Sequence, residues 1–256
     1  MKKLSMDSYA KINLTLDVFP KKSKQDFHEI KSVMHKIALA DEIEIQESKS
    51  FSIDCDAQID PEYNLVKKAF ELVQKIYSKK TPTVSVQIKK NIPIGSGLGG
   101  GSSNFATFVE LYHELFQLGP VPDDLIRKSA EWGKDIPFFF ITKSCALVEH
   151  FGEKITPLPF DFHNKKIFLY CPDLQHPTAE KYAQLKNFNT DYTDRFLQQP
   201  ALSNVGNGFD EFFQTSPYQA ISNIFPSVHI TGSGSCFWGL EKKEFRNCET
   251  IETRFL

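Results

Sequence analysis

The alternation of apolar and polar positions along the chain predicts several β-strands. From Ile12 to Val18 every second residue is apolar, which is the period-two pattern of a half-buried strand spanning residues 9–18, and Lys11 falls on its polar face. Residues 84–88 show the same alternation. Apolar residues on either side of Asp41 predict further strands.

Two longer segments, residues 65–77 and residues 105–116, carry apolar residues at helical spacing. Asp60 and Pro61 are typical of the N-cap and the first position of a helix, so we expect the first helix to begin there. The less regular remainder predicts helices after Asp123, from Thr178 and from Ser216, a Phe-rich strand over residues 137–141, strands near Ala146 and Ile167, and a strand, a Gly-rich turn and a strand over residues 228–240.

These elements favour an α+β fold, because strands and helices interleave without the regular alternation of a doubly wound sheet. A length of 256 residues fits one large domain or two modest ones. Pro157 and Pro159 mark the best boundary between two domains. We therefore expect one domain over residues 1–156 and a second over residues 157–256.

Composition and charge narrow the class of protein. Hydrophobic residues make up 41% of the chain and charged residues 24%, which is typical of a folded globular protein. The 30 Lys and Arg against 32 Asp and Glu leave a net charge of −2, so no nucleic-acid partner is expected. No stretch approaches the roughly 18 apolar residues of a membrane span, so no membrane partner is expected. The five scattered cysteines, never spaced C-x-x-C, indicate neither a disulfide framework nor a zinc site and favour a cytoplasmic location.

The clustering of glycines is the most informative feature of the sequence. Five of the 13 glycines fall between Gly95 and Gly101. Glycine permits positive φ and close approach, so such a run lets backbone amides converge on an anion. If the helix that contains Phe105 begins here, its N-terminal amides and its dipole are directed at the same anion, and phosphate is the expected ligand. The alternative is a flexible turn between a strand and a helix.

Two familiar nucleotide-binding patterns do not explain this loop. Gly95, Gly97 and Gly100 satisfy G-x-G-x-x-G, but a dinucleotide fold needs an acidic residue about 20 positions further on. The nearest acidic residue is Glu114, inside the predicted helix. A P-loop is excluded because the segment has no Gly-Lys-Ser/Thr. Positive charge for a phosphate must therefore come from elsewhere in the chain.

Three segments together resemble the motifs of the GHMP small-molecule kinases. They are YAKINL at residues 9–14, NIPIGSGLGGGSSN at residues 91–104 and ITGSGSC at residues 230–236. Their order and spacing match that family, and further similarities at residues 26–30, 64–66, 133–139 and 177–182 extend the resemblance over nearly the whole chain. The resemblance implies a two-domain fold, with a ribosomal protein S5 domain 2-like N-terminal, ATP-binding domain and a ferredoxin-like C-terminal, substrate-binding domain.

The resemblance also implies a role for each motif. Lys11 and Asp135 would form the catalytic pair, in which Asp135 accepts the proton of the attacking hydroxyl and Lys11 offsets the developing charge. Alternatively, Asp135 caps a helix or pairs with Lys134, and Lys11 is a solvated strand residue. The phosphates of ATP would lie on the glycine loop, defined here with the two residues before it as Pro93, Ile94, Gly95, Ser96, Gly97, Leu98, Gly99, Gly100, Gly101, Ser102 and Ser103.

The resemblance places the acceptor substrate on Asn13, Phe27, His28, Thr178 and Tyr182. An aromatic pair would stack on a cytosine base, and His28 would lie at its edge. The usual Gly-Tyr before the histidine reads Asp26-Phe27, so a stacking platform is retained without a phenol. Alternatively, His28 is structural and Tyr182 is a core residue.

A second departure from the family lies at residues 207–210, where Asn-Gly-Phe-Asp replaces Asn-Asp-hydrophobic-Glu. This site is either structural or near the substrate. The turn at residues 232–236 brings amides close to the substrate or the phosphates, or is only a hairpin.

The resemblance implies an ATP-dependent kinase with a small-molecule substrate. Within the family, the chain is most similar to kinases that phosphorylate the 2-hydroxyl of a cytidine diphosphate methylerythritol in the non-mevalonate route to isoprenoids. Mg²⁺ is expected to accompany ATP, with no dedicated metal site, and the chain is expected to be a monomer or a weak homodimer. The rival interpretations are another GHMP kinase and a non-catalytic nucleotide-binding protein.

Overall fold

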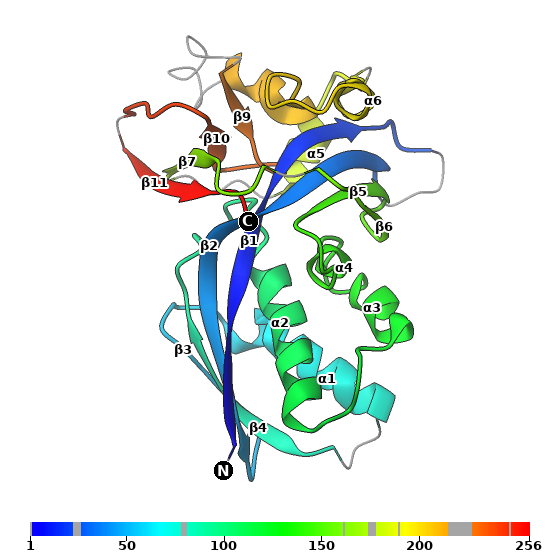
Figure 1. The fold of residues 1–256 in the computed structure, drawn as a ribbon, viewed down its shortest axis with the longest axis vertical. Helices are drawn as coiled ribbons and strands as arrows, with labels where there is room; N and C mark the ends of the chain where they lie inside the picture. Colours follow the sequence, from blue (N-terminus) through cyan, green and yellow to red (C-terminus); the bar gives the residue numbers. More distant parts are fainter. Residues whose placement is uncertain are drawn as a thin grey trace. The chain divides into compact units, whose positions relative to one another are not determined.

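The computed structural model describes residues 2–22, 27–77, 81–160, 162–173, 178–188, 190–214, 227–245 and 247–256. The chain forms two compact units. The first contains Met1–Ala10, Leu39–Ile94 and Gly99–Thr142, and the second contains Lys11–Ala38, Gly95–Leu98 and Lys143–Leu256. Strands β1 (Lys3–Val18) and β2 (Ile30–Ser48) each run from one unit into the other (Figure 1). The domain boundary predicted after residue 156 stays a prediction.

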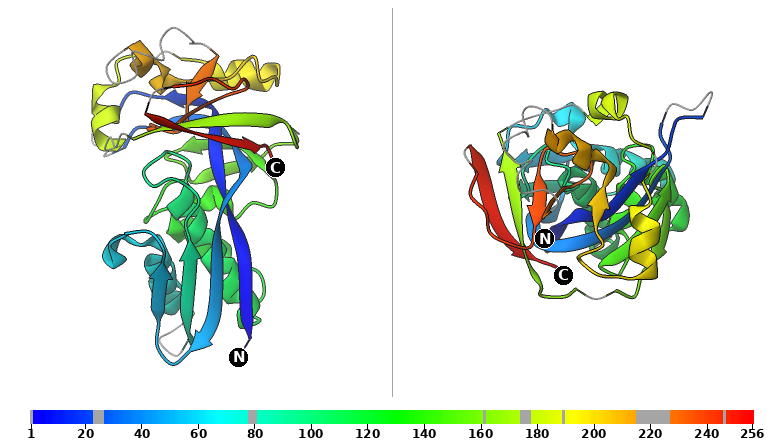
Figure 2. Two further views of the ribbon diagram at one scale, coloured as in Figure 1. Left: turned by 90° about the vertical axis from the view of Figure 1, so that its left-hand side faces the viewer. Right: turned by 90° about the horizontal axis from the view of Figure 1, so that it is seen from above.

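In the first unit, two long helices lie on one face of a sheet with the strand order β3-β4-β2-β1 (Figures 1 and 2). Strand β4 pairs with β2 in antiparallel fashion and with β3 in parallel fashion. Apart from β1 and β2, the elements of this unit are β3 (Ser52–Cys55), the 3₁₀-helix η1 (Pro61–Tyr63), α1 (Leu65–Tyr77), β4 (Thr83–Lys89), α2 (Gly100–Leu115), α3 (Asp123–Ser129) and α4 (Ile136–Phe139).

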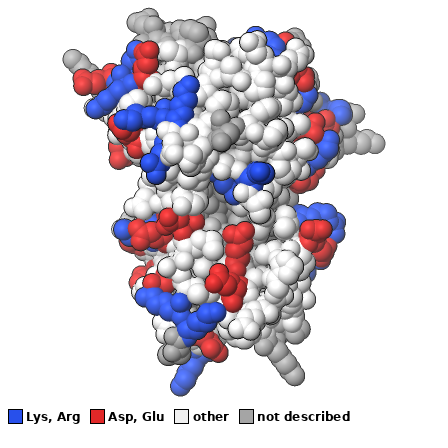
Figure 3. Space-filling model, in the orientation of Figure 1, with Lys and Arg blue, Asp and Glu red and all other residues white. Residues whose placement is uncertain are grey.

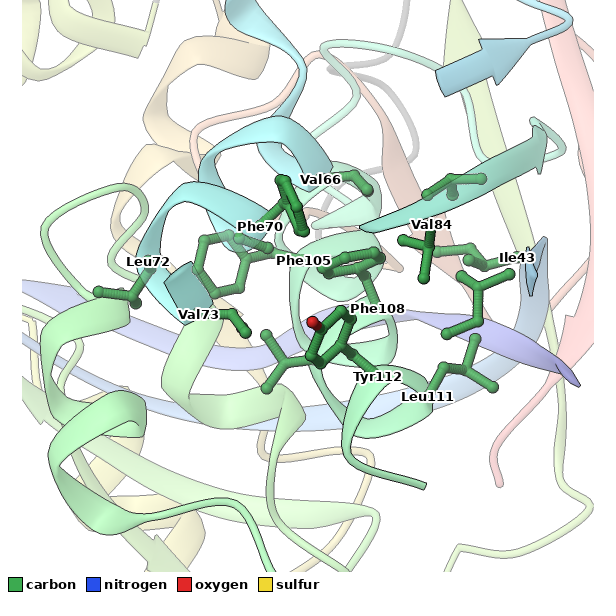
Figure 4. Close-up of a cluster of buried hydrophobic side chains, with 14 of the residues drawn as sticks. Ile43, Val66, Phe70, Leu72, Val73, Val84, Phe105, Phe108, Leu111 and Tyr112 are labelled. Carbon is green, nitrogen blue, oxygen red and sulfur yellow. The ribbon is translucent and has the colours of Figure 1, made fainter. Parts of the chain in front are cut away.

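The core of the first unit lies between this sheet and the helices α1 and α2. Figure 4 shows Phe70 of α1 and Phe105, Phe108 and Tyr112 of α2 gathered against the sheet side chain Val84. Their rings pack at angles to one another, for example Phe70 and Phe108 at 82° with 6.4 Å between centroids. Burial of these side chains fixes α2, and with it the glycine loop from which α2 begins.

The second unit is built on a four-stranded antiparallel sheet with the order β11-β7-β10-β9, in which β11 and β7 lie side by side (Figure 2). In the same unit β5 pairs with the first part of β2, and β8 pairs with the last part of β1. The elements are β5 (Cys145–His150), β6 (Lys154–Pro157), β7 (Lys166–Pro172), α5 (Thr178–Gln184), α6 (Tyr192–Gln198), β8 (Gly206–Asn207), the 3₁₀-helix η2 (Gly208–Gln214), β9 (Val228–Ile230), β10 (Phe237–Gly239) and β11 (Cys248–Arg254).

Most of the predicted elements are confirmed. The strand over residues 9–18, both long helices, the helices from Asp123 and Thr178 and the strand-turn-strand after residue 227 are all present. Asp41 lies inside the single strand β2 and does not separate two strands. Asp60 caps η1, and the side chain of Asn64 then caps α1 by accepting from the Val66 amide at 3.0 Å. The helix predicted from Ser216 begins outside the described residues.

Two expectations about local structure are wrong. The Phe-rich segment predicted as a strand over residues 137–141 forms the short helix α4, in which Pro137 stands in the first turn, where its missing N–H costs no hydrogen bond. Strand β1 is not half-buried from Ala10 onwards, since both of its faces are buried up to Val18. Lys11 is accordingly 2% exposed and does not lie on a solvated face.

The expectation that the cysteines form no disulfide is also wrong, because Cys171 and Cys236 are bonded. Strands β7 and β10 pair with Tyr170 opposite Phe237, and this register sets the two cysteines opposite each other with 4.4 Å between their Cα atoms. The bridge joins residues 65 positions apart, so cysteine spacing alone gives no sign of it.

The charge distribution agrees with the small net charge of the chain. On the face drawn in Figure 3, groups of basic side chains alternate with groups of acidic ones. In the part of the chain that the structure describes, no helix has both the length and the apolar character needed to cross a membrane.

Candidate active site

The first part of the glycine loop, residues 95–98, packs against the turn at residues 231–236 in the second unit. Gly97 adopts a φ of +78°, and a Cβ at this position would lie 2.2 Å from the carbonyl oxygen of Thr231. Only glycine permits both this conformation and this approach. Two hydrogen bonds join the segments, from Thr231 Oγ1 to the Gly97 carbonyl at 3.3 Å and from the Cys236 amide to the Ser96 carbonyl at 3.1 Å.

Lys11 and Asn13 lie beside these segments in the same unit. Lys11 Nζ donates to Asn13 Oδ1 at 2.7 Å, and the Lys11 amide donates to the Leu98 carbonyl at 2.9 Å. Asn13 Oδ1 also accepts from the Gly232 amide at 2.8 Å. The Asn13 Nδ2 donates to Ser32 Oγ at 2.8 Å. The first motif, the glycine loop and the third motif therefore meet in one buried hydrogen-bonded cluster.

The rest of the glycine loop begins α2 in the first unit. Gly99 is the N-cap of this helix in the left-handed conformation, with a φ of +75°. The first amides of an α-helix have no acceptor within the helix, and its dipole favours an anion at this end. Ser103 Oγ accepts from Ser8 Oγ at 2.8 Å, which ties the first turn of α2 to β1. The prediction that the helix starts directly at the glycine loop is confirmed.

A buried carboxylate at Asp41 holds the chain just before the glycine loop. Its Oδ1 accepts from the amides of Asn91 and Ile92, both at 2.8 Å. Its Oδ2 accepts from Asn104 Nδ2 at 2.9 Å and from Lys90 Nζ. Sequence analysis noted Asp41 only as an interruption between apolar residues. A charged residue inside an apolar strand is the signal that could have identified it, because a buried charge needs such partners.

Asp135 lies at the N-cap position of α4 in the first unit, but its side chain makes no capping hydrogen bond with that helix. Helix capping therefore does not account for the carboxylate. Asp135 lies in the segment between α3 and α4, and the Ile136 amide that follows it donates to the Gly133 carbonyl at 3.0 Å. The carboxylate remains chemically suited to accept a proton.

His28 lies in an aromatic group of the second unit. Its Nδ1 is 2.7 Å from the Phe19 carbonyl, and because a carbonyl can only accept, Nδ1 carries a proton. The ring lies 5.5 Å from Tyr182, tilted by 34°, and stacks on Phe188 at 5.5 Å and 9°. Phe27 beside it is 57% exposed. Sequence analysis missed Phe188, which lies outside the motifs.

Helix α5 carries one residue bonded to the third motif and one buried lysine. The Thr178 hydroxyl accepts from Ser233 Oγ at 3.2 Å, which links α5 to the 231–236 turn. Lys181, one turn further along, is buried, and this burial lowers the pKa of its ammonium from 10.5 to about 8. Neither helical spacing nor charge distinguishes Lys181 in the sequence, so sequence analysis missed it as well.

These observations define what the two units offer chemically. The second unit brings together Lys11, Asn13, residues 95–98 and the 231–236 turn, and it separately gathers His28 with Tyr182. The first unit supplies the start of α2 and the carboxylate of Asp135. Among the described residues, no group of three or more His, Cys, Asp or Glu side chains could hold a metal ion. The arrangement suits an anion bound by backbone amides beside one amine.

The chain is similar to several known proteins. Residues 64–143 match the family described as GHMP kinases N terminal domain. A 4-diphosphocytidyl-2-C-methyl-D-erythritol kinase from Pseudothermotoga lettingae is 32% identical over 269 residues, covering 95% of this chain and 94% of that protein. One from Clostridium botulinum is 37% identical over 253 residues, covering 91% and 89%. The crystal structure of a 4-(cytidine 5'-diphospho)-2C-methyl-D-erythritol kinase has the same fold, with a TM-score of 0.80, 23% identity and coverage of 98% and 99%.

The close approach at Gly97 predicts a difference between two neighbouring glycines. Gly95 and Gly97 both have positive φ, at +70° and +78°, but only at Gly97 would a Cβ meet backbone atoms. Alanine at either position costs about 1–2 kcal/mol for the left-handed conformation. We expect Gly97→Ala to lose about 1–3 kcal/mol more than Gly95→Ala, since it also displaces the Thr231 carbonyl. Urea denaturation of both variants measures the difference, and equal losses would contradict the close packing of the two segments.

The buried ammonium of Lys181 predicts a pH dependence of stability. Below pH 8 the lysine is charged in both the folded and unfolded states, so the penalty of burying the charge is fully present. Between pH 8 and about 10.5 only the folded state loses the proton, so the stability of the wild type rises relative to Lys181→Met. Urea denaturation across this range measures the change. The exposed Lys186→Met is the control, and a flat difference for Lys181→Met would show that its pKa is not lowered.

Proposed function

The chain belongs to the GHMP kinase family, and on this premise we propose that it transfers the γ-phosphoryl group of ATP to the 2-hydroxyl of 4-diphosphocytidyl-2-C-methyl-D-erythritol. The relatives that carry the name of this kinase match the chain over nearly its whole length. The chain is thus an ATP-dependent enzyme with a small-molecule substrate. Its reaction belongs to the non-mevalonate pathway of isoprenoid biosynthesis.

The meeting of the three motif segments in the second unit carries the proposal. Lys11 Nζ, Asn13 Oδ1 and the Gly232 amide form one hydrogen-bonded group, beside residues 95–98. A simple turn between a strand and a helix would not require Gly97 to pack directly against the backbone of another segment. The cluster instead holds the glycine loop in one conformation. It also places the desolvated amine of Lys11 beside the loop, which supports phosphoryl transfer.

We propose that the glycine loop and the first amides of α2 bind the phosphates of ATP, and that Lys11 and Asp135 are the catalytic pair. The acceptor hydroxyl oxygen attacks the γ-phosphorus while the bond from that phosphorus to the β,γ-bridging oxygen breaks, and ADP leaves. The hydroxyl proton passes to the carboxylate of Asp135. The ammonium of Lys11 offsets the negative charge on the transferred group. Because such a transfer asks little covalent chemistry of the protein, positioning supplies most of the rate.

Magnesium enters the proposal as part of the nucleotide substrate. Mg²⁺ usually keeps several waters and is bound through substrate phosphates. Bound in this way, Mg²⁺ neutralises charge on the β- and γ-phosphates. We therefore propose no dedicated metal site in the protein.

We propose that His28, Phe27 and Tyr182 bind the cytosine base. In the neutral tautomer protonated on Nδ1, His28 Nε2 can accept a hydrogen bond from the exocyclic amino group of cytosine, whereas uracil presents a carbonyl there. Aromatic faces at Phe27 and Tyr182 can stack on the base. Asn13 and Thr178, both attached to the third motif by hydrogen bonds, would hold the methylerythritol diphosphate portion.

The catalytic assignment predicts that Asp135→Asn abolishes turnover without loss of the fold. Removing the proton acceptor should lower kcat by about 100- to 10,000-fold. A coupled assay of ADP formation with ATP, Mg²⁺ and the diphosphocytidyl substrate measures kcat. Asp123→Asn, an exposed acid-to-amide change at the start of α3, is the matched control and should keep the wild-type rate. Wild-type turnover in Asp135→Asn would exclude Asp135 as the base. ATP binding without turnover of any alcohol in an acceptor panel would favour a non-catalytic nucleotide-binding protein.

The cytosine assignment predicts a loss of base selection in His28→Ala. Losing one hydrogen bond of about 0.5–1.5 kcal/mol should raise the KM for the cytidine substrate about 2- to 12-fold and leave kcat nearly unchanged. The preference for the cytidine over the uridine form of the substrate should fall by the same factor. His163→Ala, at an exposed position of the same unit, is the control. An unchanged preference in His28→Ala would place the base elsewhere.

A further inference from the structure

A buried polar group lies behind the 231–236 turn in the second unit. Asp210, which is 4% exposed, accepts from the Asn207 amide at 3.1 Å and from His229 Nδ1 at 2.8 Å through Oδ2. Its Oδ1 accepts from the Ile230 amide at 2.8 Å. Both carboxylate oxygens are therefore engaged with the strand that leads into the turn, through bonds of the stronger, charge-assisted kind.

Asn207 connects this group to the turn itself. Its Nδ2 donates to the carbonyls of Ile230 at 2.6 Å and Gly232 at 2.9 Å. Its Oδ1 accepts from the Phe209 amide at 2.9 Å. The oxygen of the side chain thus shapes its own loop, whereas both hydrogens of the amide nitrogen are directed at the third motif. Asn207 is 1% exposed, so water cannot replace these donors.

Gly232 passes this constraint to the candidate catalytic lysine. Its carbonyl accepts from Asn207, while its amide, in the preceding peptide group, donates to Asn13 Oδ1, the atom that also accepts from Lys11 Nζ. A shift of the Gly232 backbone would remove one of the two donors that fix Asn13 Oδ1. The position of the Lys11 ammonium therefore depends on Asn207 through a short series of hydrogen bonds, all within one unit.

From this series we infer that Asn207 and Asp210 are positioning residues for phosphoryl transfer: Asp210 fixes Asn207 and β9, and Asn207 fixes the Gly232 backbone, which sets Asn13 and Lys11. The inference rests on the proposed function. It assigns a role to the segment in which Asn-Gly-Phe-Asp departs from the family pattern. Asp210, although one methylene shorter than glutamate, meets three donors there.

The decisive variant is Asn207→Asp, which keeps the shape of the side chain and the Oδ1 acceptor but removes both donors to the turn. We expect kcat to fall at least 10-fold, while the KM values for ATP and the acceptor change less than threefold, since Lys11 acts on the reacting group. Asn204→Asp is the matched control, because Asn204 makes a hydrogen bond to Gln199 at 2.8 Å on the surface of the same unit. The control should stay within twofold of wild type.

A second pair of variants separates positioning from folding. Asp210→Glu keeps a carboxylate that can reach the same donors, so it should retain at least a third of the wild-type kcat. Asp210→Ala leaves three donors without their acceptor and should lose at least 10-fold. If Asn207→Asp does not fold, Asn207→Ser, which keeps one donor, takes its place with an expected kcat between those of wild type and Asp210→Ala. Wild-type kcat in the Asn207 variant, or equal losses in both Asp210 variants, would overturn the inference.

A spectroscopic measurement tests the same contact independently of activity. The ¹³C carbonyl resonance of Gly232 should shift in Asn207→Asp and stay unchanged in Asn204→Asp, because only the first variant removes a hydrogen bond to that carbonyl. An unshifted resonance would overturn the inference even if kcat falls. If the wild type fails to phosphorylate the diphosphocytidyl substrate, the proposed function is wrong, and the carbonyl shift still decides whether Asn207 holds the turn.

Discussion

The hydrogen bonds that converge on Asn13 Oδ1 are the interaction on which the candidate site of the second unit depends. This one atom accepts from Lys11 Nζ and from the Gly232 amide, so it joins segments that lie more than 200 residues apart in the sequence. A lysine that is 2% exposed has exchanged most of its water for protein contacts, and it is stable there only where acceptors are already in position. The cluster therefore fixes both the location and the surroundings of the amine.

Local features of the sequence predicted the elements that carry this cluster. The period-two pattern of residues 9–18 gave strand β1, and the helical spacing after residue 104 gave α2, because the apolar side chains at these spacings pack into large cores. The density of glycines marked the loop, since only backbone contacts such as that of Gly97 with Thr231 require glycine at a fixed position. The resemblance to a family then supplied Lys11, Asn13 and Asp135, whose residue types alone do not distinguish them from surface residues.

Features that depend on contacts between distant segments could not be predicted from the sequence. Residues 137–139 are buried on every side, so their pattern has no period and α4 resembled a strand. Lys11 was placed on a solvated face because the alternation of β1 does not show that both faces are covered. The bond between Cys171 and Cys236 follows from the pairing of β7 with β10, and the stacking of Phe188 on His28 joins two loops. In each case the missing information is which segments become neighbours.

Four backbone amides of the 231–236 turn are used in hydrogen bonds within the second unit. The amides of Thr231, Gly232, Gly234 and Cys236 donate to the Cys236 carbonyl, Asn13 Oδ1, the Thr231 carbonyl and the Ser96 carbonyl. Amides committed in this way hold the fold together and are not free to bind phosphate as well. The turn therefore has a structural role, since residues 95–98 of the glycine loop pack against it. At the start of α2, by contrast, helix geometry leaves the first amides without an acceptor inside the helix, which is why the proposal puts the phosphates there.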